Sequence, residues 1–127
     1  LCCNGEGCSG GALGIGVGDK MLMMQYSYFA TISHEGCATI LWKSAEKASD
    51  AAKIMGITPN RLLDLEIIDE IIPEPLGGSH RDPKAAAHNL KQVLQKHLRD
   101  LMQMSPDSLL ESRYDRLMNF GEFEIKK

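Results

Sequence analysis

The chain has 127 residues, of which 43% are hydrophobic and 24% charged, and its net charge is −3. This length and composition are typical of one ordinary globular domain. The acidic balance provides no basic surface for nucleic acid or an anionic membrane. No apolar run reaches the ~20 residues that span a bilayer, and no charged-then-apolar leader opens the sequence, so we expect a cytoplasmic protein.

Glycine dominates the first part of the chain, where seven of the 12 glycines fall between Gly5 and Gly18. The first residues, "LCCN", are too few for a strand with its own turn, and they lead directly into a glycine loop. Residues 10–19 are predicted to form a short helix with a bare face at Gly10, Gly14 and Gly18. Each helical glycine costs about 1 kcal/mol relative to alanine. Several glycines in one helix therefore indicate that close packing or a ligand requires them.

The middle of the chain alternates between buried strands and short helices. Residues 20–33 are apolar enough for one or two mostly buried strands, whose methionines we expect in the core. Ser33 is placed to cap a helix that ends at Trp42, a residue expected in the core or at a subunit interface. A helix over 44–56 should end at Gly56, and Pro59 should open another.

The second half begins with a β-branched strand over 67–75, ended by Pro73 and Pro75. A loop over 76–82 precedes the longest helix, over 83–104. Its apolar stripe follows the spacing of an amphipathic helix: Ala87, Leu90, Leu94, Leu98 and Leu101. A last helix should start at Ser105 and end at Gly121, and we expect residues 122–127 to be frayed.

The glycine-rich stretch permits three interpretations. Gly5, Gly7 and Gly10 match the dinucleotide pattern GxGxxG, but the strand before it and the acidic residue about 20 positions later are missing. The P-loop pattern also fails, since Met21 follows Lys20 where serine or threonine is needed. Two interpretations remain open: close helix packing, or unpaired amides at a helix start that stabilise a developing oxyanion.

Four cysteines, Cys2, Cys3, Cys8 and Cys37, form no CxxC pair and no second cluster at zinc spacing. We therefore expect no metal site. Buried thiols that pack as small hydrophobic side chains are the simpler interpretation.

Long stretches of the chain closely resemble the carboxyltransferase alpha subunits of bacterial acetyl-coenzyme A carboxylase. The blocks are "GEGCSGGALGIGVGDK", "ISHEGCATILWKSAEKA" and "LDLEIIDEIIPEPLGGSHRDP", and the similarity continues through "RYDRLMNFG". The resemblance implies an α/β fold, the C-terminal portion of a crotonase-like ββα spiral followed by two terminal helices. It divides the chain into a core portion over 1–80 and a helical extension over 81–127.

The resemblance also implies a reaction and its partners. The carboxyl group of carboxybiotin, held on a biotin carboxyl carrier protein, passes to acetyl-CoA to give malonyl-CoA for fatty acid synthesis. The active site lies between alpha and beta subunits of an α2β2 assembly, with the biotin side on the alpha subunit. The family's oxyanion hole falls on the backbone amides of Gly10 and Gly11, and Gly7 and Ser9 complete the biotin-binding turn. Gly14 and Gly18 would then serve packing.

Three departures from the family pattern stand out. Cys8 replaces a usual glycine, which would strain the loop only if its backbone φ were positive. His34 replaces a usual proline at a helix start. Family members are more than twice as long, so we expect this chain to be a C-terminal part, with a noncatalytic fragment that binds the beta subunit or a full-length alpha chain as the alternative.

Other polar residues are expected to have structural or solvent-exposed roles. Glu35 fits a first-turn acid better than a general base, and His80 fits a solvated loop histidine better than one that contacts biotin or a partner. Three basic residues are predicted to be surface charges rather than coenzyme contacts: Lys43, Arg81 and Lys84. His88 and His97 lie on the predicted long helix and suggest no pair of metal ligands.

Overall fold

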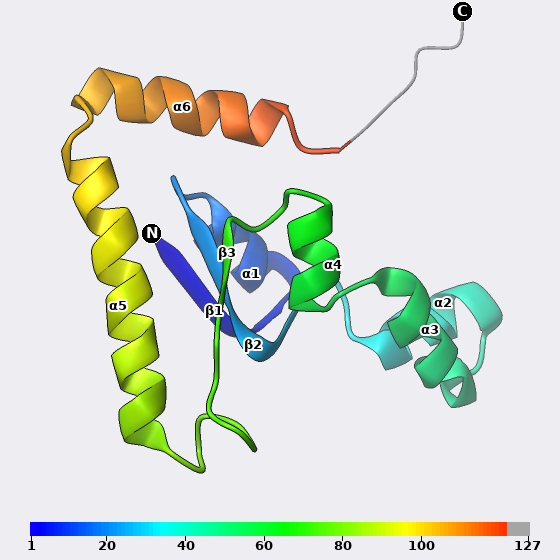
Figure 1. Cartoon of the computed structure of the whole chain (residues 1–127). Coiled ribbons are helices and arrows are strands. Elements are labelled where there is room, and N and C mark those ends of the chain that lie inside the picture. Colours follow the sequence, from blue (N-terminus) through cyan, green and yellow to red (C-terminus); the bar gives the residue numbers. More distant parts are fainter. Residues whose placement is uncertain (122–127) are drawn as a thin grey trace, which may run out of the picture.

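The protein folds around a three-stranded parallel sheet with the strand order β1-β2-β3 (Figure 1). The structure, a computed structural model, describes residues 1–121, and at Cys2 and Asn4 the backbone alone. The tail expected to fray, residues 122–127, lies outside the described residues. Helix α1 (Ser9–Gly16) connects β1 (Cys2–Cys8) to β2 (Met21–Ala30), and β3 is Glu70–Ile72. Between β2 and β3 lie α2 (His34–Trp42), η1 (Ala45–Lys47), α3 (Ala48–Met55) and α4 (Pro59–Asp64); α5 (Pro83–Met102) and α6 (Pro106–Met118) follow.

Strand β1 corrects the expectation of a glycine loop after "LCCN". The strand extends through Gly5 to Cys8, and Gly7 and Cys8 pair with Phe29 and Ala30 of β2. The pairing partner supplies the ladder hydrogen bonds, so tertiary context overrides the low strand propensity of glycine.

Strand β2 is one continuous strand with a bulge in its middle. Asn4 pairs with Met23, but Glu6, only two residues later, pairs with Tyr28. The additional β2 residues leave the ladder, and the Ser27 hydroxyl donates a 2.6 Å hydrogen bond to the Met24 carbonyl oxygen. The bulge directs Tyr26 into solvent, where 58% of it is exposed.

The core lies between β2, β3 and α4. Met21 and Met23 pack with Leu62 and Ile68, which confirms these two methionines as core residues. Leu22 and Ile72 are fully buried as well. Met24, by contrast, is half-buried beside the bulge, and Trp42 is 40% exposed rather than in the core.

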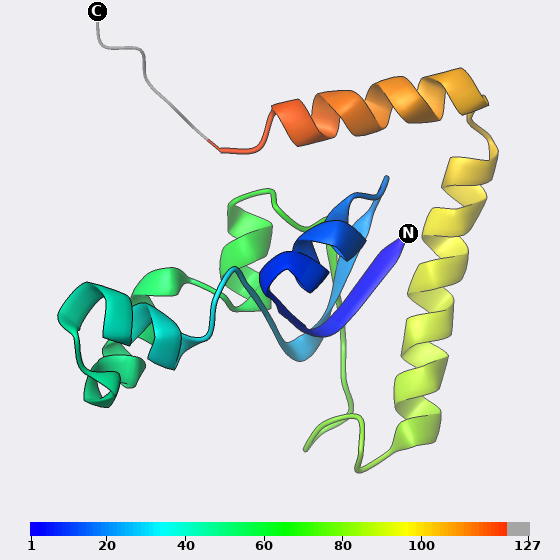
Figure 2. The same ribbon diagram turned by 180° about the vertical axis from the view of Figure 1, so that it is seen from behind.

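Helices α2 and α3, with η1 between them, form an arm that projects from the sheet (Figures 1 and 2). Ser33 caps α2 as predicted, since its hydroxyl accepts from the Gly36 amide at 3.1 Å. The helix expected over 44–56 splits into η1 and α3, and Gly56 ends it in the left-handed conformation as predicted. Within the arm only Ala38 and Ala51 are buried.

Helix α5 runs beside β3, and α6 turns across the end of the sheet (Figure 2). The predicted stripe of α5 is rotated by about one residue, because Ala86 and His97 are the buried positions whereas Ala87 and Leu98 are exposed. Helix α6 starts after Ser105, whose hydroxyl caps Ser108. The division of the chain at residue 80 stays a prediction.

Asp69, just before β3, anchors α6 to the sheet. Its carboxylate accepts hydrogen bonds from the Met21 amide at 2.7 Å, Lys20 at 2.9 Å and Arg116 at 3.1 Å. Burial alone would raise the pKa of this carboxyl, but these hydrogen bonds and the charges of Arg116 and Lys20 outweigh it and hold the pKa below its ordinary value. Arg113 adds a 2.7 Å ion pair with Asp19.

Glu70 makes the corresponding anchor for α5. Its carboxylate contacts Lys96 at 2.7 Å and the buried His97 ring at 2.9 Å. The hydrogen bond from Lys96 is the main cause that lowers the pKa of Glu70 against the opposing effect of burial. Two consecutive acidic residues therefore fix the two terminal helices.

Candidate functional site

The turn from β1 into α1 is the centre of the candidate site. Cys8 is the last residue of the strand, with an extended φ of −145°, and Ser9 has a positive φ of 61°. Gly10 and Gly11 follow as the second and third residues of α1. First-turn amides have no partner within a helix, and the Cys8 side chain makes no capping hydrogen bond here. The N–H groups of Gly10 and Gly11 therefore lie at the positive end of the helix dipole.

The glycines of this helix are not explained by contacts within the described chain. A Cβ built on Gly10, Gly11 or Gly14 would have no heavy atom within 4 Å. At Gly18 the nearest atom is the Lys20 carbonyl oxygen at 3.8 Å. The described residues supply no neighbour against which Gly14 would pack, so the packing role stays a prediction. None of Gly10, Gly11 and Gly14 has a positive φ, so their backbone would also accept a side chain.

The positive φ that we considered for Cys8 is instead at Ser9. Because Cys8 is extended, its side chain causes no backbone strain, and this departure from the family pattern is harmless to the loop. The spacing of Gly7, Ser9 and Gly11 is the G-x-S-x-G spacing of a strand–turn–helix elbow, and it could have predicted the sharp turn at Ser9.

A small hollow of about 240 Å³ lies against this turn. We call it the turn hollow, and its lining residues are Glu6, Gly7, Cys8, Gly11, Ala12, Ile15 and Phe29. Two residues predicted for the biotin side, Gly7 and Gly11, thus line one cavity. Ser9 and Gly10 lie at the same turn and are exposed.

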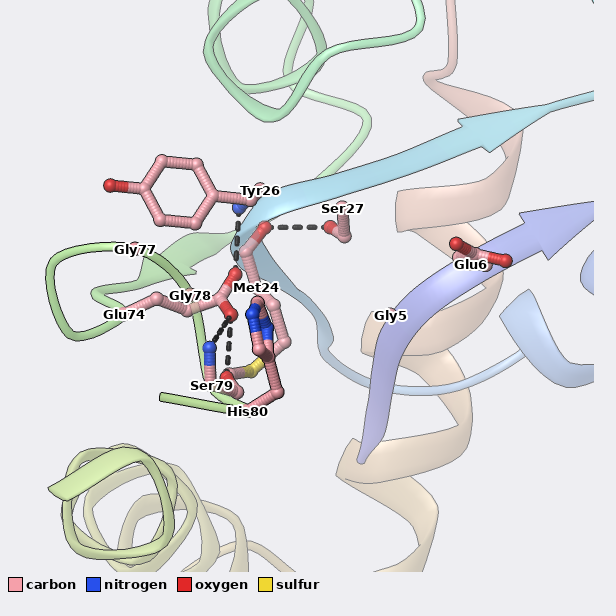
Figure 3. A pocket seen from close by; sticks show the side chains of 10 residues that line it. All are labelled: Gly5, Glu6, Met24, Tyr26, Ser27, Glu74, Gly77, Gly78, Ser79 and His80. Carbon is pink, nitrogen blue, oxygen red and sulfur yellow. Dashed lines mark hydrogen bonds between the residues drawn. The ribbon is translucent and has the colours of Figure 1, made fainter. Parts of the chain in front are cut away.

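A larger groove of about 700 Å³ opens on the other side of Glu6, at the bulge of β2 (Figure 3). We call it the bulge groove, and its lining residues are Gly5, Glu6, Met24, Tyr26, Ser27, Glu74, Gly77, Gly78, Ser79 and His80. Sequence reasoning missed it, because the bulge that shapes it has no pattern in the sequence. Its only sequence signal was the Gly77-Gly78 pair, both with positive φ.

Glu74 fastens the far wall of the bulge groove (Figure 3). Its carboxylate accepts from the Tyr26 amide at 2.8 Å, the Ser79 amide at 3.0 Å and the Ser79 hydroxyl at 2.5 Å. Burial would raise the pKa of Glu74, but these hydrogen bonds, with the charge of His80, hold it below its ordinary value. The loop over 74–80 is thereby tied to the β2 bulge.

The remaining sequence candidates lie away from the turn. Glu35 is exposed in the first turn of α2, 2.9 Å from His34, and the arm that carries it projects away from α1 (Figure 1). His80 is an exposed loop residue, as predicted, but it lines the bulge groove. The three basic residues are exposed, as expected: Lys43, Arg81 and Lys84.

Histidines and cysteines give no metal centre among the side chains that the structure describes. His97 is buried against Glu70, and His88 lies 3.4 Å from Gln92. The expectation of buried thiols is wrong for Cys3, which is exposed, whereas Cys8 and Cys37 are half-buried. Gly5 and Gly7 lie within β1 rather than in a turn after it, a geometry unlike the dinucleotide fingerprint. Within residues 1–121, no helix is long and apolar enough to cross a membrane.

Comparison with known proteins identifies relatives of this chain. Residues 1–121 match the family model described as acetyl co-enzyme A carboxylase carboxyltransferase-like. The acetyl-coenzyme A carboxylase carboxyl transferase subunit alpha of Francisella tularensis subsp. novicida (strain U112) is 58% identical over 120 residues, which are 94% of this chain and 38% of that protein. The protein of the same name from Pasteurella multocida (strain Pm70) is 63% identical over 117 residues, 92% of this chain and 37% of that protein. The chain thus spans well under half the length of these curated relatives.

Proposed function

Since the chain belongs to the acetyl co-enzyme A carboxylase carboxyltransferase-like family, we propose that it is part of an alpha subunit that moves a carboxyl group from carboxybiotin to acetyl-CoA. The full names of the relatives support the reaction, and the β1–α1 turn supports its location on this chain. We include in the proposal the C-terminal portion of a crotonase-like spiral, which the parallel β1-β2-β3 sheet with helices in its connections supports.

The amides of Gly10 and Gly11 are the groups that we expect to act on the biotin side. As the carboxyl group leaves the biotin nitrogen, the electron pair of that C–N bond moves onto the ureido group and its oxygen gains negative charge. The carboxyl carbon bonds to the methyl carbon of acetyl-CoA, whose proton ends on the biotin nitrogen. Two helix-start amides near the ureido oxygen would stabilise that charge, each typically by about 2.7–4 kcal/mol.

The observation that carries this proposal is the open space above Gly10 and Gly11. Neither backbone conformation nor packing within the described residues requires glycine there, because a Cβ would meet nothing within 4 Å. A group that approaches the backbone from outside would require it. Carboxybiotin on its carrier protein fits this role, and Gly7 and Ser9 complete the turn beneath it.

The test is Gly11→Val in a complete alpha subunit assembled with its beta partner. We expect carboxyl transfer to fall by about two orders of magnitude, because the valine side chain would keep the ureido oxygen away from the amide and so have the effect of losing one oxyanion donor. Gly14→Val is the matched control, since it makes the same change one turn later, where the amide is already used within the helix. Normal turnover of Gly11→Val in an assembled enzyme would contradict the assignment. An equal collapse of both variants would indicate a crowded protein interface instead.

The partners belong to the same proposal: a beta subunit in an α2β2 assembly, a biotin carboxyl carrier protein and a cytoplasmic location. A second candidate is a noncatalytic chain that binds the beta subunit or a full-length alpha chain. The exposed apolar side chains of the arm favour it, since Ile40 and Leu41 are 69% and 60% exposed. Purified chain that binds the beta subunit but supports no transfer would select this second function.

A further inference from the structure

The bulge groove and the turn hollow share one residue, Glu6, and lie along the same strand. Gly5 and Glu6 border the groove, while Glu6, Gly7 and Cys8 border the hollow. From Gly5 to Cys8 an extended strand covers roughly 10 Å. The two cavities therefore adjoin at Glu6, and the hollow reaches the first turn of α1.

The charges around the groove restrict what can occupy it. Glu74 keeps its carboxylate ionised near neutral pH, since its pKa is held below the ordinary value, and Glu6 is a second, exposed carboxylate on the opposite wall. The two carboxylates oppose an anionic ligand such as the phosphates of coenzyme A, while His80 in the lining and Arg81, whose side chain lies against Gly77, are the basic groups beside them. The remaining wall offers Met24, Tyr26 and the Gly77–Gly78 turn, against which the His80 and Arg81 side chains lie, and its apolar part suits a slender, uncharged chain.

Taken with the proposed function, on which this inference rests, we propose that the bulge groove binds the uncharged tether that joins biotin to the lysine of its carrier protein. The tether is an aliphatic chain with one amide and about ten bonds, with a reach on the order of 12 Å. That reach is comparable to the roughly 10 Å of β1 between Gly5, at the groove, and Cys8, beside the turn into α1. The ring at its end would then meet the amides of Gly10 and Gly11, while coenzyme A approaches from elsewhere.

Gly5 and Glu6 allow a test that leaves the oxyanion turn intact. A side chain at Gly5 would obstruct the groove without a clash, because a Cβ there meets no described atom within 4 Å and the φ of Gly5 is not positive. Glu6→Gln removes one of the two carboxylates with no change of size. Ser112→Leu, on the exposed surface of α6, is the control for an added apolar side chain.

The experiment measures the reverse reaction in the complete alpha–beta enzyme. Malonyl-CoA loses its carboxyl group to the biotin nitrogen; a C–C bond breaks, a C–N bond forms, and the nitrogen's proton ends on the methyl carbon of acetyl-CoA. The acceptors are free biotin, whose chain ends in a carboxylate, and biotin amide, whose chain ends uncharged. In the wild type we expect a lower KM for the amide than for free biotin.

Gly5→Leu should raise the KM for biotin amide about tenfold or more, the usual effect of one altered apolar contact, with the KM for malonyl-CoA unchanged. Glu6→Gln should lower the KM for free biotin and leave that for the amide unchanged. Unaltered KM values for both acceptors in both variants would overturn the inference, and so would a rise in the KM for malonyl-CoA alone. If the Gly5→Leu variant fails to assemble, the KM values of the Glu6→Gln variant still test the inference.

The two proposals fail in different ways. A wild-type enzyme that carboxylates neither biotin nor its amide would refute the proposed function. A wild-type enzyme that carboxylates both equally well, with variants that match it, would refute only the tether groove.

Discussion

Two helical regions flank the sheet, and they are attached to it by different means. Helix α6 is fixed by Arg113, which contacts Asp19, and by Arg116, which contacts Asp69 and the Gly18 carbonyl oxygen. The contacts of Arg113 with Asp19 and of Arg116 with Gly18 join residues more than 90 positions apart. The arm of α2 and α3 packs mainly on itself and leaves Ile40, Leu41, Trp42 and Ile54 at least 40% exposed. The first region is held to the sheet by charged contacts, whereas the arm presents an apolar surface that other protein can cover, as α6 also does at Leu110, Tyr114 and Met118.

Low pH should have the largest effect on this difference, because it protonates the carboxylates that attach α5 and α6 to the sheet. The folded-state pKa values of Asp69 and Glu70 are lowered, so their stabilising effect is present above the ordinary values near 4 and is lost as the pH falls through the lowered ones. We expect the free energy of unfolding to fall below about pH 4, with α5 and α6 released first. Urea unfolding at a series of pH values, followed by hydrogen exchange of α6, measures this. If, as the pH falls, hydrogen exchange rises in the arm before it rises in α6, this prediction is wrong.

Substitution of Asp69 should have the next largest effect. Asp69→Asn leaves Arg116 and Lys20 without their partner, and we expect a loss of roughly 2–3 kcal/mol in the free energy of unfolding, somewhat below the range for a fully buried pair. Urea midpoints provide the measurement. The variant should also flatten the acid dependence; an unchanged pH profile would show that other groups cause it.

Glu70→Gln should cost less, about 1 kcal/mol, because Lys96 is largely exposed and can return to solvent. The buried His97 ring keeps a polar partner in the glutamine amide. A double change with Lys96→Met should add little, since the ion pair has already been broken. A loss as large as that of Asp69→Asn would mean that α5 depends on this anchor as much as α6 does.

The arm should show the smallest effect on the chain itself. Ile40→Ser removes an exposed apolar side chain, so we expect a change within about 0.5 kcal/mol in the free energy of unfolding. Binding to the beta subunit or to a full-length alpha chain should weaken if this surface is covered in the assembly. A stability loss above 1 kcal/mol would show that Ile40 packs within its own chain after all.

The sequence predicted local elements better than their connections. The caps at Ser33 and Ser105 and the left-handed Gly56 follow from local chemistry, and all three are confirmed. Strand β1 was missed because its stability comes from pairing with β2, not from its own residues. The Arg116–Asp69 contact was equally invisible, since it joins residues 47 apart.

Part of the candidate site could likewise be predicted from local sequence, and part could not. The glycine turn was recognisable from composition, and the resemblance assigned it a role that stays a prediction. None of the glycines in this turn has a positive φ, because that conformation belongs to Ser9. The bulge groove depends on three segments meeting at the β2 bulge, and no single stretch of sequence contains that information.

The contact between Arg116 and the Gly18 carbonyl oxygen also has a consequence for the order of assembly during synthesis. The segment that ends α1 leaves the ribosome 98 residues before the arginine that secures it. Contacts of such long sequence separation form late, since the intervening chain must first be closed into a loop. A nascent chain would therefore have its glycine helix while the far end of that helix is still loose, and translation through α6 would complete it.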